Sequence, residues 1–122
     1  MNKYHNKKTE VDGIVFDSRK EAKYYLYLKQ RQLNGEIENL RLQVPFELVP
    51  AVYKDVTVQL KTKTKTVRKQ MQRPITYIAD FVYTDIATGA ECVIDCKGLR
   101  TKEYRLKAKM MYAFKGIMIV EV

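Results

Sequence analysis

The 122-residue sequence predicts one α/β domain, spanning residues 1–122, built around a mixed central sheet. Segments with apolar residues at helical spacing alternate with shorter segments rich in β-branched and aromatic residues. Hydrophobic residues make up 46% of the chain, which favours a folded core over a disordered chain. The predicted order is hairpin, helix, strand, ribbon, strand, strand, helix and strand.

The first third of the chain should form a small hairpin and a helix. Residues 1–9 are polar and basic, as is typical of a loose tail. An Asp12-Gly13 turn between apolar flanks then predicts a hairpin. Ser18-Arg19-Lys20-Glu21 matches a capping box, so a helix should begin at Ser18, and Asn34-Gly35 should end it.

The middle of the chain passes from a strand into a strongly basic segment. The strand should run from Arg41 to Val49, and Pro45 within it suits an edge strand or a bulge. Residues 54–73 carry seven basic residues against Asp55 alone, and their alternation predicts an exposed β-ribbon inserted into the fold. The alternation after Leu60 should place three lysines on one side of this ribbon. These lysines are Lys61, Lys63 and Lys65.

The last third should complete the sheet. Thr76–Thr84 and Glu91–Lys97 are predicted to pair as antiparallel strands across the turn at residues 85–90. Thr101 can cap a helix that extends to about Lys115 and ends at Gly116. Ile117–Val122 should close the chain as a strand.

Charge points to a polyanionic partner. The net charge of +9 favours nucleic acid, although an excess of lysine also serves solubility. No apolar run approaches the roughly 20 residues that span a bilayer, and the first residues lack an apolar signal core. We therefore expect an intracellular protein without a membrane partner.

Several chemistries are disfavoured by residue usage. His5 is the one histidine and lies in the tail, which excludes a catalytic site in which histidine activates a serine or cysteine nucleophile. The chain also has no glycine-rich phosphate-binding loop. Cys92 and Cys96 would lie about 13 Å apart on one strand, too far for a disulfide, and no second ligand pair would complete a zinc site. Both thiols should point away from Asp95 and pack in the core.

Two acidic residues and a lysine are the main candidates for chemistry. A hairpin centred on residues 87–88 places Asp80 directly opposite Asp95, and Lys97 lies on the same face as Asp95. Two carboxylates within apolar strands are costly unless a cation lies between them. Asp80, Asp95 and the Cys96 carbonyl could hold a divalent metal, with Lys97 activating water or stabilising a phosphate. The alternative is an Asp–Lys salt bridge on an exposed face.

Two further residues are each open to two interpretations. Glu21 could reach back to the Ser18 backbone as part of the capping box, or it could point at the edge of the core with Tyr25. Gln43 could contact the acidic site from its strand or bond to the backbone.

Taken together, these residues resemble the motif of a known protein family. Glu21 on the opening helix, Asp80 on one strand and Asp95-Cys96-Lys97 on the next resemble the PD-(D/E)XK nuclease superfamily, in particular a small phage-encoded branch similar to Holliday-junction resolvases and restriction endonucleases. Ala79 stands where the motif has proline, which lowers its specificity. The segments that carry the resemblance are residues 16–22, 43–46, 77–81 and 94–98.

The resemblance implies a restriction-endonuclease-like αβββαβ core and a DNA endonuclease. Glu21, Asp80 and Asp95 would bind Mg²⁺ or Mn²⁺, and Lys97 would serve the attacking water. The substrate expected is branched or recombination-intermediate DNA, cut in the cytoplasm of a bacterial host. One site per chain would favour a homodimer for cutting two strands. The alternatives are a non-catalytic nucleic-acid-binding protein on the same fold and a nuclease subunit of a larger assembly.

Basic residues on the ribbon and the second helix are the candidates for binding DNA. The ribbon lysines could instead only block edge-to-edge aggregation, and the basic face of the helix could simply be solvated. The candidate residues are Lys61, Lys63, Lys65, Arg68, Lys69, Arg73, Arg105 and Lys107.

Overall fold

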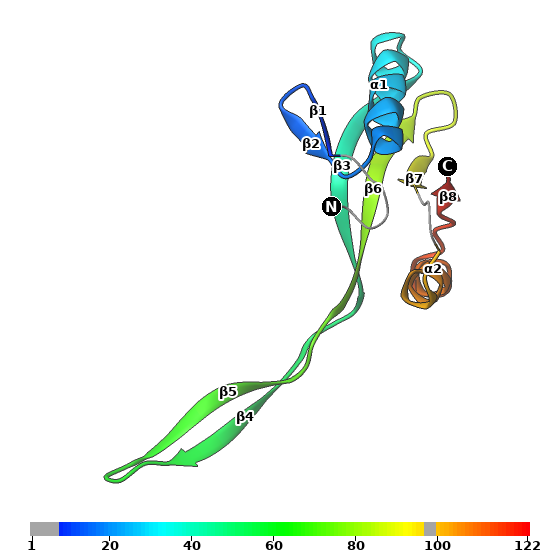
Figure 1. The fold of residues 1–122 in the computed structure, drawn as a ribbon. Helices are drawn as coiled ribbons and strands as arrows, with labels where there is room; N and C mark the ends of the chain where they lie inside the picture. Colours follow the sequence, from blue (N-terminus) through cyan, green and yellow to red (C-terminus); the bar gives the residue numbers. More distant parts are fainter. Residues whose placement is uncertain (1–7, 97–99) are drawn as a thin grey trace.

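The structure is a computed structural model and describes residues 8–96 and 100–122. A four-stranded sheet in the order β3-β6-β7-β8 forms its centre, and β1-β2 and β4-β5 form two separate two-stranded ribbons (Figure 1). The elements are β1 (Thr9–Val11), β2 (Ile14–Phe16), α1 (Arg19–Leu33), β3 (Ile37–Val49), β4 (Val52–Gln59), β5 (Thr64–Gln72), β6 (Ile75–Asp85), β7 (Glu91–Asp95), α2 (Lys102–Lys115) and β8 (Val120–Glu121).

The central sheet is mixed, as the sequence predicts. β6 pairs antiparallel with β3 and β7, whereas β8 pairs parallel with β7. Without the two ribbons, the described elements follow one another as α1, β3, β6, β7, α2 and β8, which is the predicted order.

The two helices cover opposite faces of this sheet. Phe81 and Ile94 belong to a core cluster with Tyr25 and Leu28 of α1. Their neighbours Val82 and Val93 belong to a second cluster with Tyr104 and Met111 of α2. Because successive side chains of a strand point to opposite faces, the sheet lies between the helices. The core side chains in these clusters anchor the strands that carry Asp80 and Asp95.

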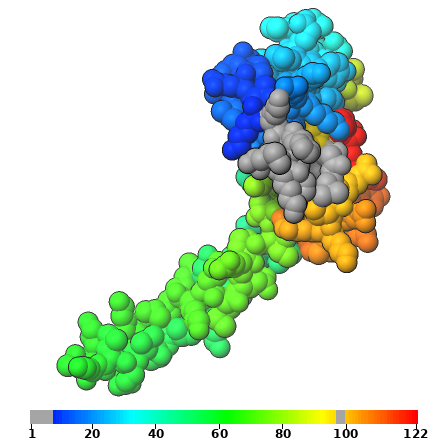
Figure 2. All heavy atoms as spheres, viewed as in Figure 1, coloured from blue at the N-terminus to red at the C-terminus, as the bar shows by residue number. Residues whose placement is uncertain are grey.

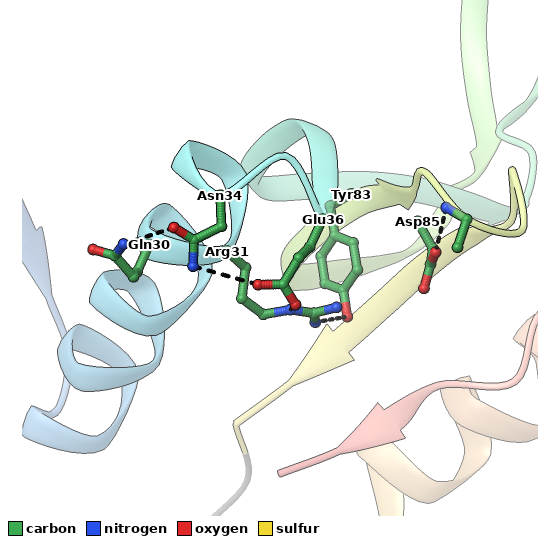
Figure 3. A network of polar contacts seen from close by, with 7 residues as sticks. Gln30, Arg31, Asn34, Glu36, Tyr83 and Asp85 are labelled. Carbon is green, nitrogen blue, oxygen red and sulfur yellow. Dashed lines mark hydrogen bonds and ion pairs between the residues drawn. The ribbon is translucent and has the colours of Figure 1, made fainter.

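A polar network fixes the C-terminal end of α1 against the sheet (Figure 3). Arg31 donates to Glu36 and to the hydroxyl of Tyr83 on β6, at 3.4 and 3.5 Å. Asn34, the C-cap of α1, donates to Glu36 and accepts from Gln30. The contact between Arg31 and Tyr83 therefore ties the helix to the strand on which Asp80 lies.

The local predictions at the N-terminus are confirmed. Asp12 and Gly13 have φ angles of 54° and 76°, the left-handed conformations that a tight hairpin turn between β1 and β2 requires. Ser18 caps α1, with its hydroxyl accepting from the Glu21 backbone N–H at 3.1 Å. Pro45 lies on β3, an edge strand of the central sheet, as its missing N–H favours.

Several predicted bounds were wrong. β3 begins at Ile37, four residues before Arg41, because Ile37 is buried in the α1 cluster directly after the turn that ends the helix. The last strand comprises only Val120–Glu121, since Ile117 and Ile119 pack against the α2 cluster instead. The Lys97 end of the predicted strand lies outside the described residues.

The basic ribbon is present, but its lysines are not arranged as predicted. The Leu60 N–H donates to the Lys63 carbonyl at 2.8 Å, so the chain reverses between β4 and β5 at this point. Lys61 and Lys63 therefore lie at the turn, and only Lys65 lies on a strand. The expectation of three lysines along one side of an extended segment was wrong because the alternating sequence contains the turn itself.

The two cysteines are free thiols, both partly buried beside the α1 cluster. Among the described residues, no helix is both long and apolar enough to cross a membrane.

Candidate functional site

Glu21 lies in the first turn of α1 with its side chain directed at the sheet. Its backbone N–H bonds to the Ser18 cap, and its carboxylate accepts a hydrogen bond from Gln43 Nε2 at 3.1 Å. Only 7% of the residue is exposed. The sequence left a capping role and a core-edge position open for this carboxylate, and the structure places it at the core edge.

Gln43 and Asp80 face each other at an irregular point of the sheet. On either side of them, Leu42 pairs with Phe81 and Val44 pairs with Ala79. Gln43 itself has a φ of 51°, a left-handed conformation that is unusual for a non-glycine residue within a strand. Its side-chain Nε2 lies 3.4 Å from Asp80 Oδ1 as well as 3.1 Å from Glu21 Oε1.

The same point marks a change in what the strands contact. Leu42 on β3 and Phe81 on β6 pack with the α1 cluster. Val44, two residues after Leu42, and Ala79, two residues before Phe81, pack with the α2 cluster although alternation alone would keep them on the first face. Asp80 therefore lies at the point where the strands stop packing with the α1 cluster and begin packing with the α2 cluster, close to the first turn of α1.

Asp95 lies at the end of β7 and is 1% exposed. Its carboxylate accepts a hydrogen bond from the Tyr77 hydroxyl, and its carbonyl accepts one from the Val122 N–H at 3.0 Å. Burial and this hydrogen bond raise the pKa of Tyr77, so the hydroxyl remains a neutral donor to Asp95.

The predicted register between the two acidic strands is confirmed. The four pairs from Phe81 with Ile94 to Thr84 with Glu91 have the predicted offset. The same offset brings Asp80 and Asp95 opposite each other, one step beyond the pair of Phe81 and Ile94. The Cys96 backbone N–H donates to Asp80 Oδ2 at 2.8 Å, which joins the two strands at this point.

Three carboxylates thus share one electrostatic environment. Burial raises the pKa of Glu21 to about 7, with further contributions from the negative charges of Asp80, Asp17 and Asp95. Burial together with Asp80 and Glu21 also raises the pKa of the neighbouring Cys96 thiol to about 12. The site is therefore electronegative, and the Gln43 amide group supplies an electropositive donor between two of its carboxylates.

The donor chemistry of the site fits Mg²⁺ or Mn²⁺, because these hard cations take oxygen ligands and are often held by a few carboxylates. Within the described part of the chain, however, no three His, Cys, Asp or Glu residues form a group that could hold a metal ion. Gln43 has its amide nitrogen within hydrogen-bond distance of Glu21 and Asp80 in this structure. Lys97, the fourth predicted catalytic residue, lies outside the described residues.

The residues predicted to bind DNA lie on α2 and on the β4–β5 ribbon. On α2, Arg105 is exposed, and Lys107 forms an ion pair with Glu103 at 3.0 Å. Lys107 also borders a depression of about 300 Å³ whose lining includes Tyr77, the partner of Asp95. On the ribbon, Lys65, Arg68 and Lys69 lie on β5, and Arg73 follows it.

Sequence reasoning missed one polar partner of the site, Tyr77, and left the role of the other, Gln43, open. Tyr77 has no motif that distinguishes it from a core aromatic residue, and its contact with Asp95 follows only from three-dimensional packing. Gln43 contacts the acidic site, which is one of the two roles open to it from the sequence. Its position opposite Asp80 depends on the pairing of β3 with β6, which are separated by the whole ribbon. The turn between β6 and β7, by contrast, was short enough to fix the register locally.

Comparison with known proteins gives a family without an assigned activity. No curated protein and no solved structure matches the chain. A protein family described as "Protein of unknown function (DUF1064)" matches residues 1–120. The match covers almost the whole chain, and the chain therefore belongs to the DUF1064 family.

Proposed function

We propose that this protein is a divalent-metal-dependent endonuclease that hydrolyses phosphodiester bonds in DNA, with branched or recombination-intermediate DNA as its substrate. One observation carries the proposal. Glu21, Asp80 and Asp95 come from a helix and two strands, and burial of Glu21, followed by repulsion from the neighbouring carboxylates, raises the pKa of Glu21 to about 7. Acidic residues arranged at such an energetic cost favour a role in binding a cation.

In this proposal Asp80, Asp95 and Glu21 hold Mg²⁺ or Mn²⁺. The metal, when bound, would polarise the phosphate and lower the pKa of a bound water. The Tyr77 hydroxyl orients Asp95, and the Cys96 N–H orients Asp80, so that neither carboxylate turns freely. Lys97 is proposed to serve the attacking water, an assignment that rests on its place in the sequence two residues after Asp95.

The charge of the protein supports a nucleic-acid substrate. The chain has 23 basic residues against 14 acidic ones, yet three acidic residues gather at the proposed site. Basic residues elsewhere would supply most of the affinity for phosphates, and the acidic site would supply the chemistry. One site per chain favours a homodimer for cutting both strands of a branched substrate.

A non-catalytic DNA-binding protein is the second candidate. It is favoured by the absence, among residues 8–96 and 100–122, of any group of three acidic, His or Cys residues that could hold a metal. The two functions predict the same DNA affinity but differ in cleavage.

A cleavage screen tests the proposal. Four-way junctions, flaps, duplexes and single strands of DNA are incubated with the protein and Mg²⁺, Mn²⁺ or EDTA. We expect metal-dependent cleavage of at least one branched substrate, lost in Asp80→Ala, Asp95→Ala and Lys97→Ala while DNA binding is retained. Glu47→Gln, an exposed change on β3, is the control that should cut normally. Binding without cleavage under all conditions would favour the non-catalytic alternative.

A further inference from the structure

The β4–β5 ribbon extends away from the rest of the molecule (Figures 1 and 2). None of its residues belongs to either core cluster. All of its strand residues are exposed except Val56 and Val67, which are partly exposed and lie opposite each other. A ribbon that contributes nothing to the core still costs conformational entropy to order, which favours a role in binding.

The register divides the ribbon into two faces of different chemistry. On one face, Val56 pairs with Val67 at the centre, with basic residues on both sides. The other face is mainly polar and uncharged, and its Arg68 lies over the Tyr53 ring at 4.1 Å, opposite Asp55. We name the first the lysine–valine face, and its members are Lys54, Val56, Val58, Lys65, Val67 and Lys69.

Charge and dimensions identify the partner of this face. The segment 54–73 carries a net charge of +6, so a polyanion is attracted to it, whereas a second copy of the ribbon is repelled. The eight residues of β4 span about 27 Å, which corresponds to about eight base pairs of duplex. The major groove of B-form DNA, about 12 Å wide, admits a two-stranded β-ribbon, whereas the major groove of A-form RNA is too narrow.

We propose that the ribbon binds in the major groove of B-form duplex DNA, with its lysine–valine face toward the DNA. The lysines would contact phosphates on the two sides of the groove, and the valines would contact apolar groups at the base edges, such as thymine methyls. The inference rests on the proposed function in taking DNA as the substrate. It adds that the substrate includes a duplex arm of about eight base pairs or more beside the cleavage site.

The test measures DNA binding in EDTA, where no metal-dependent cleavage occurs. The variant carries Lys54→Gln, Lys65→Gln and Lys69→Gln. The matched control carries Lys102→Gln, Lys109→Gln and Lys115→Gln, which removes the same charge from exposed positions of α2. We expect the ribbon variant to bind a 20-base-pair duplex at least tenfold more weakly and to lower the slope of log affinity against log salt by up to about 2.7. The control should change both quantities less.

Groove and partner are tested with the unmodified protein. Methyl green, which occupies the major groove, should compete with binding, whereas the minor-groove ligand netropsin should not. A duplex RNA of the same sequence should bind more weakly. Duplex arms shorter than about eight base pairs should lose affinity.

Four results would overturn the inference. These are an unchanged salt slope in the ribbon variant, competition by netropsin alone, equal affinity for duplex RNA, and a dimer in sedimentation without DNA that the ribbon variant dissociates. The last result would identify a second copy as the partner. Binding is measured in EDTA and therefore does not depend on cleavage. If the ribbon were needed for binding but no DNA were cleaved in the metal screen, the nuclease proposal would be rejected and the proposal for the ribbon would stand.

Discussion

Glu21 combines two roles that are usually separate, since its backbone completes the cap of α1 and its carboxylate faces two other acids. Its pKa of about 7, against an ordinary value of 4.5, has consequences for stability. Below about pH 4.5 the carboxyl is protonated in both the folded and the unfolded chain, so its burial does not lower the free energy of unfolding. Between pH 4.5 and 7 the unfolded chain ionises first, so folding becomes less favourable as pH rises, and above about pH 7 the full cost is present.

We therefore predict that Glu21→Gln stabilises the metal-free protein at pH 8 by about 1–3 kcal/mol and has little effect at pH 5. The amide oxygen of Gln would still accept the hydrogen bond from Gln43. Urea unfolding at the two pH values measures the difference. Glu47→Gln, which removes an exposed carboxylate, should stay within about 0.5 kcal/mol at both. An equal effect of Glu21→Gln at pH 5 and pH 8 would mean that burial does not raise the pKa of Glu21.

Gln43 gives a second prediction, because its backbone and its side chain can be separated. Glycine accepts a φ of 51° without strain, whereas alanine does not. Gln43→Gly and Gln43→Ala both lose the amide group, so Gln43→Gly should be more stable than Gln43→Ala by about 1 kcal/mol in urea unfolding.

Position 47, on the same strand but without a positive φ, provides the control. There the order should reverse, with Glu47→Ala more stable than Glu47→Gly, because glycine in a strand loses more conformational entropy on folding. If alanine and glycine were equally stable at position 43, the left-handed conformation would not be a property of the folded chain.

At the scale of elements, the sequence predicted what local chemistry determines. The caps at Ser18 and Thr101, the Asp12-Gly13 turn and the offset between β6 and β7 all follow from residues that are close in sequence. The early start of β3 and the short β8 could not be predicted in the same way. Both depend on which apolar residues the α1 and α2 clusters accept, and this is decided by tertiary packing.

The ribbon illustrates the same limit within one element. Its exposure follows from its composition, but residues 54–73 contain no glycine, proline or asparagine to mark the turn. The position of the turn at Leu60–Lys63 decides which residues share a face. It therefore separates the lysines at the turn from those on the lysine–valine face.

The ribbon should also be dispensable for folding. Val49 pairs with Ile75 at its base, so an Asn-Gly turn can replace residues 50–74 and join β3 directly to β6. Since no ribbon residue belongs to a core cluster, we expect the shortened protein to unfold cooperatively, with a melting temperature within a few degrees of the full chain. Circular dichroism during heating measures this. Loss of the cooperative transition would show that the ribbon is part of the folding unit.

At the scale of the whole molecule, opposite charges are separated. The ribbon is basic and projects outward (Figure 2). The acidic site lies in the first turn of α1 and on the part of the sheet where the strands leave the α1 cluster for the α2 cluster. In our proposal the ribbon binds DNA and the acidic site cleaves it. The two parts can therefore be tested separately, by binding without metal and by metal binding without DNA.

Metal binding without DNA should appear as stabilisation of the folded state. A cation that binds only the folded protein stabilises it by about 2.7 kcal/mol at a hundredfold excess over its dissociation constant. We predict that Mg²⁺ or Mn²⁺ raises the melting temperature of the unmodified protein and not that of Asp80→Asn. Without metal, Asp80→Asn should be at least as stable as the unmodified protein, because it removes repulsion with Glu21. A metal response of the same size in Asp80→Asn would exclude Asp80 as a ligand.

The central claim is that Glu21, Asp80 and Asp95 bind a divalent metal with which the protein cleaves DNA, and single-turnover cleavage tests it most directly. Protein in excess over a labelled four-way junction saturates binding, so the measured rate reports chemistry rather than affinity. We predict a Mg²⁺-dependent rate for the unmodified protein and for Glu47→Gln, and a rate at least a hundredfold lower for Asp80→Asn and Asp95→Asn under the same saturation. Cleavage by Asp95→Asn at the unmodified rate, or cleavage that persists in EDTA, would contradict the claim.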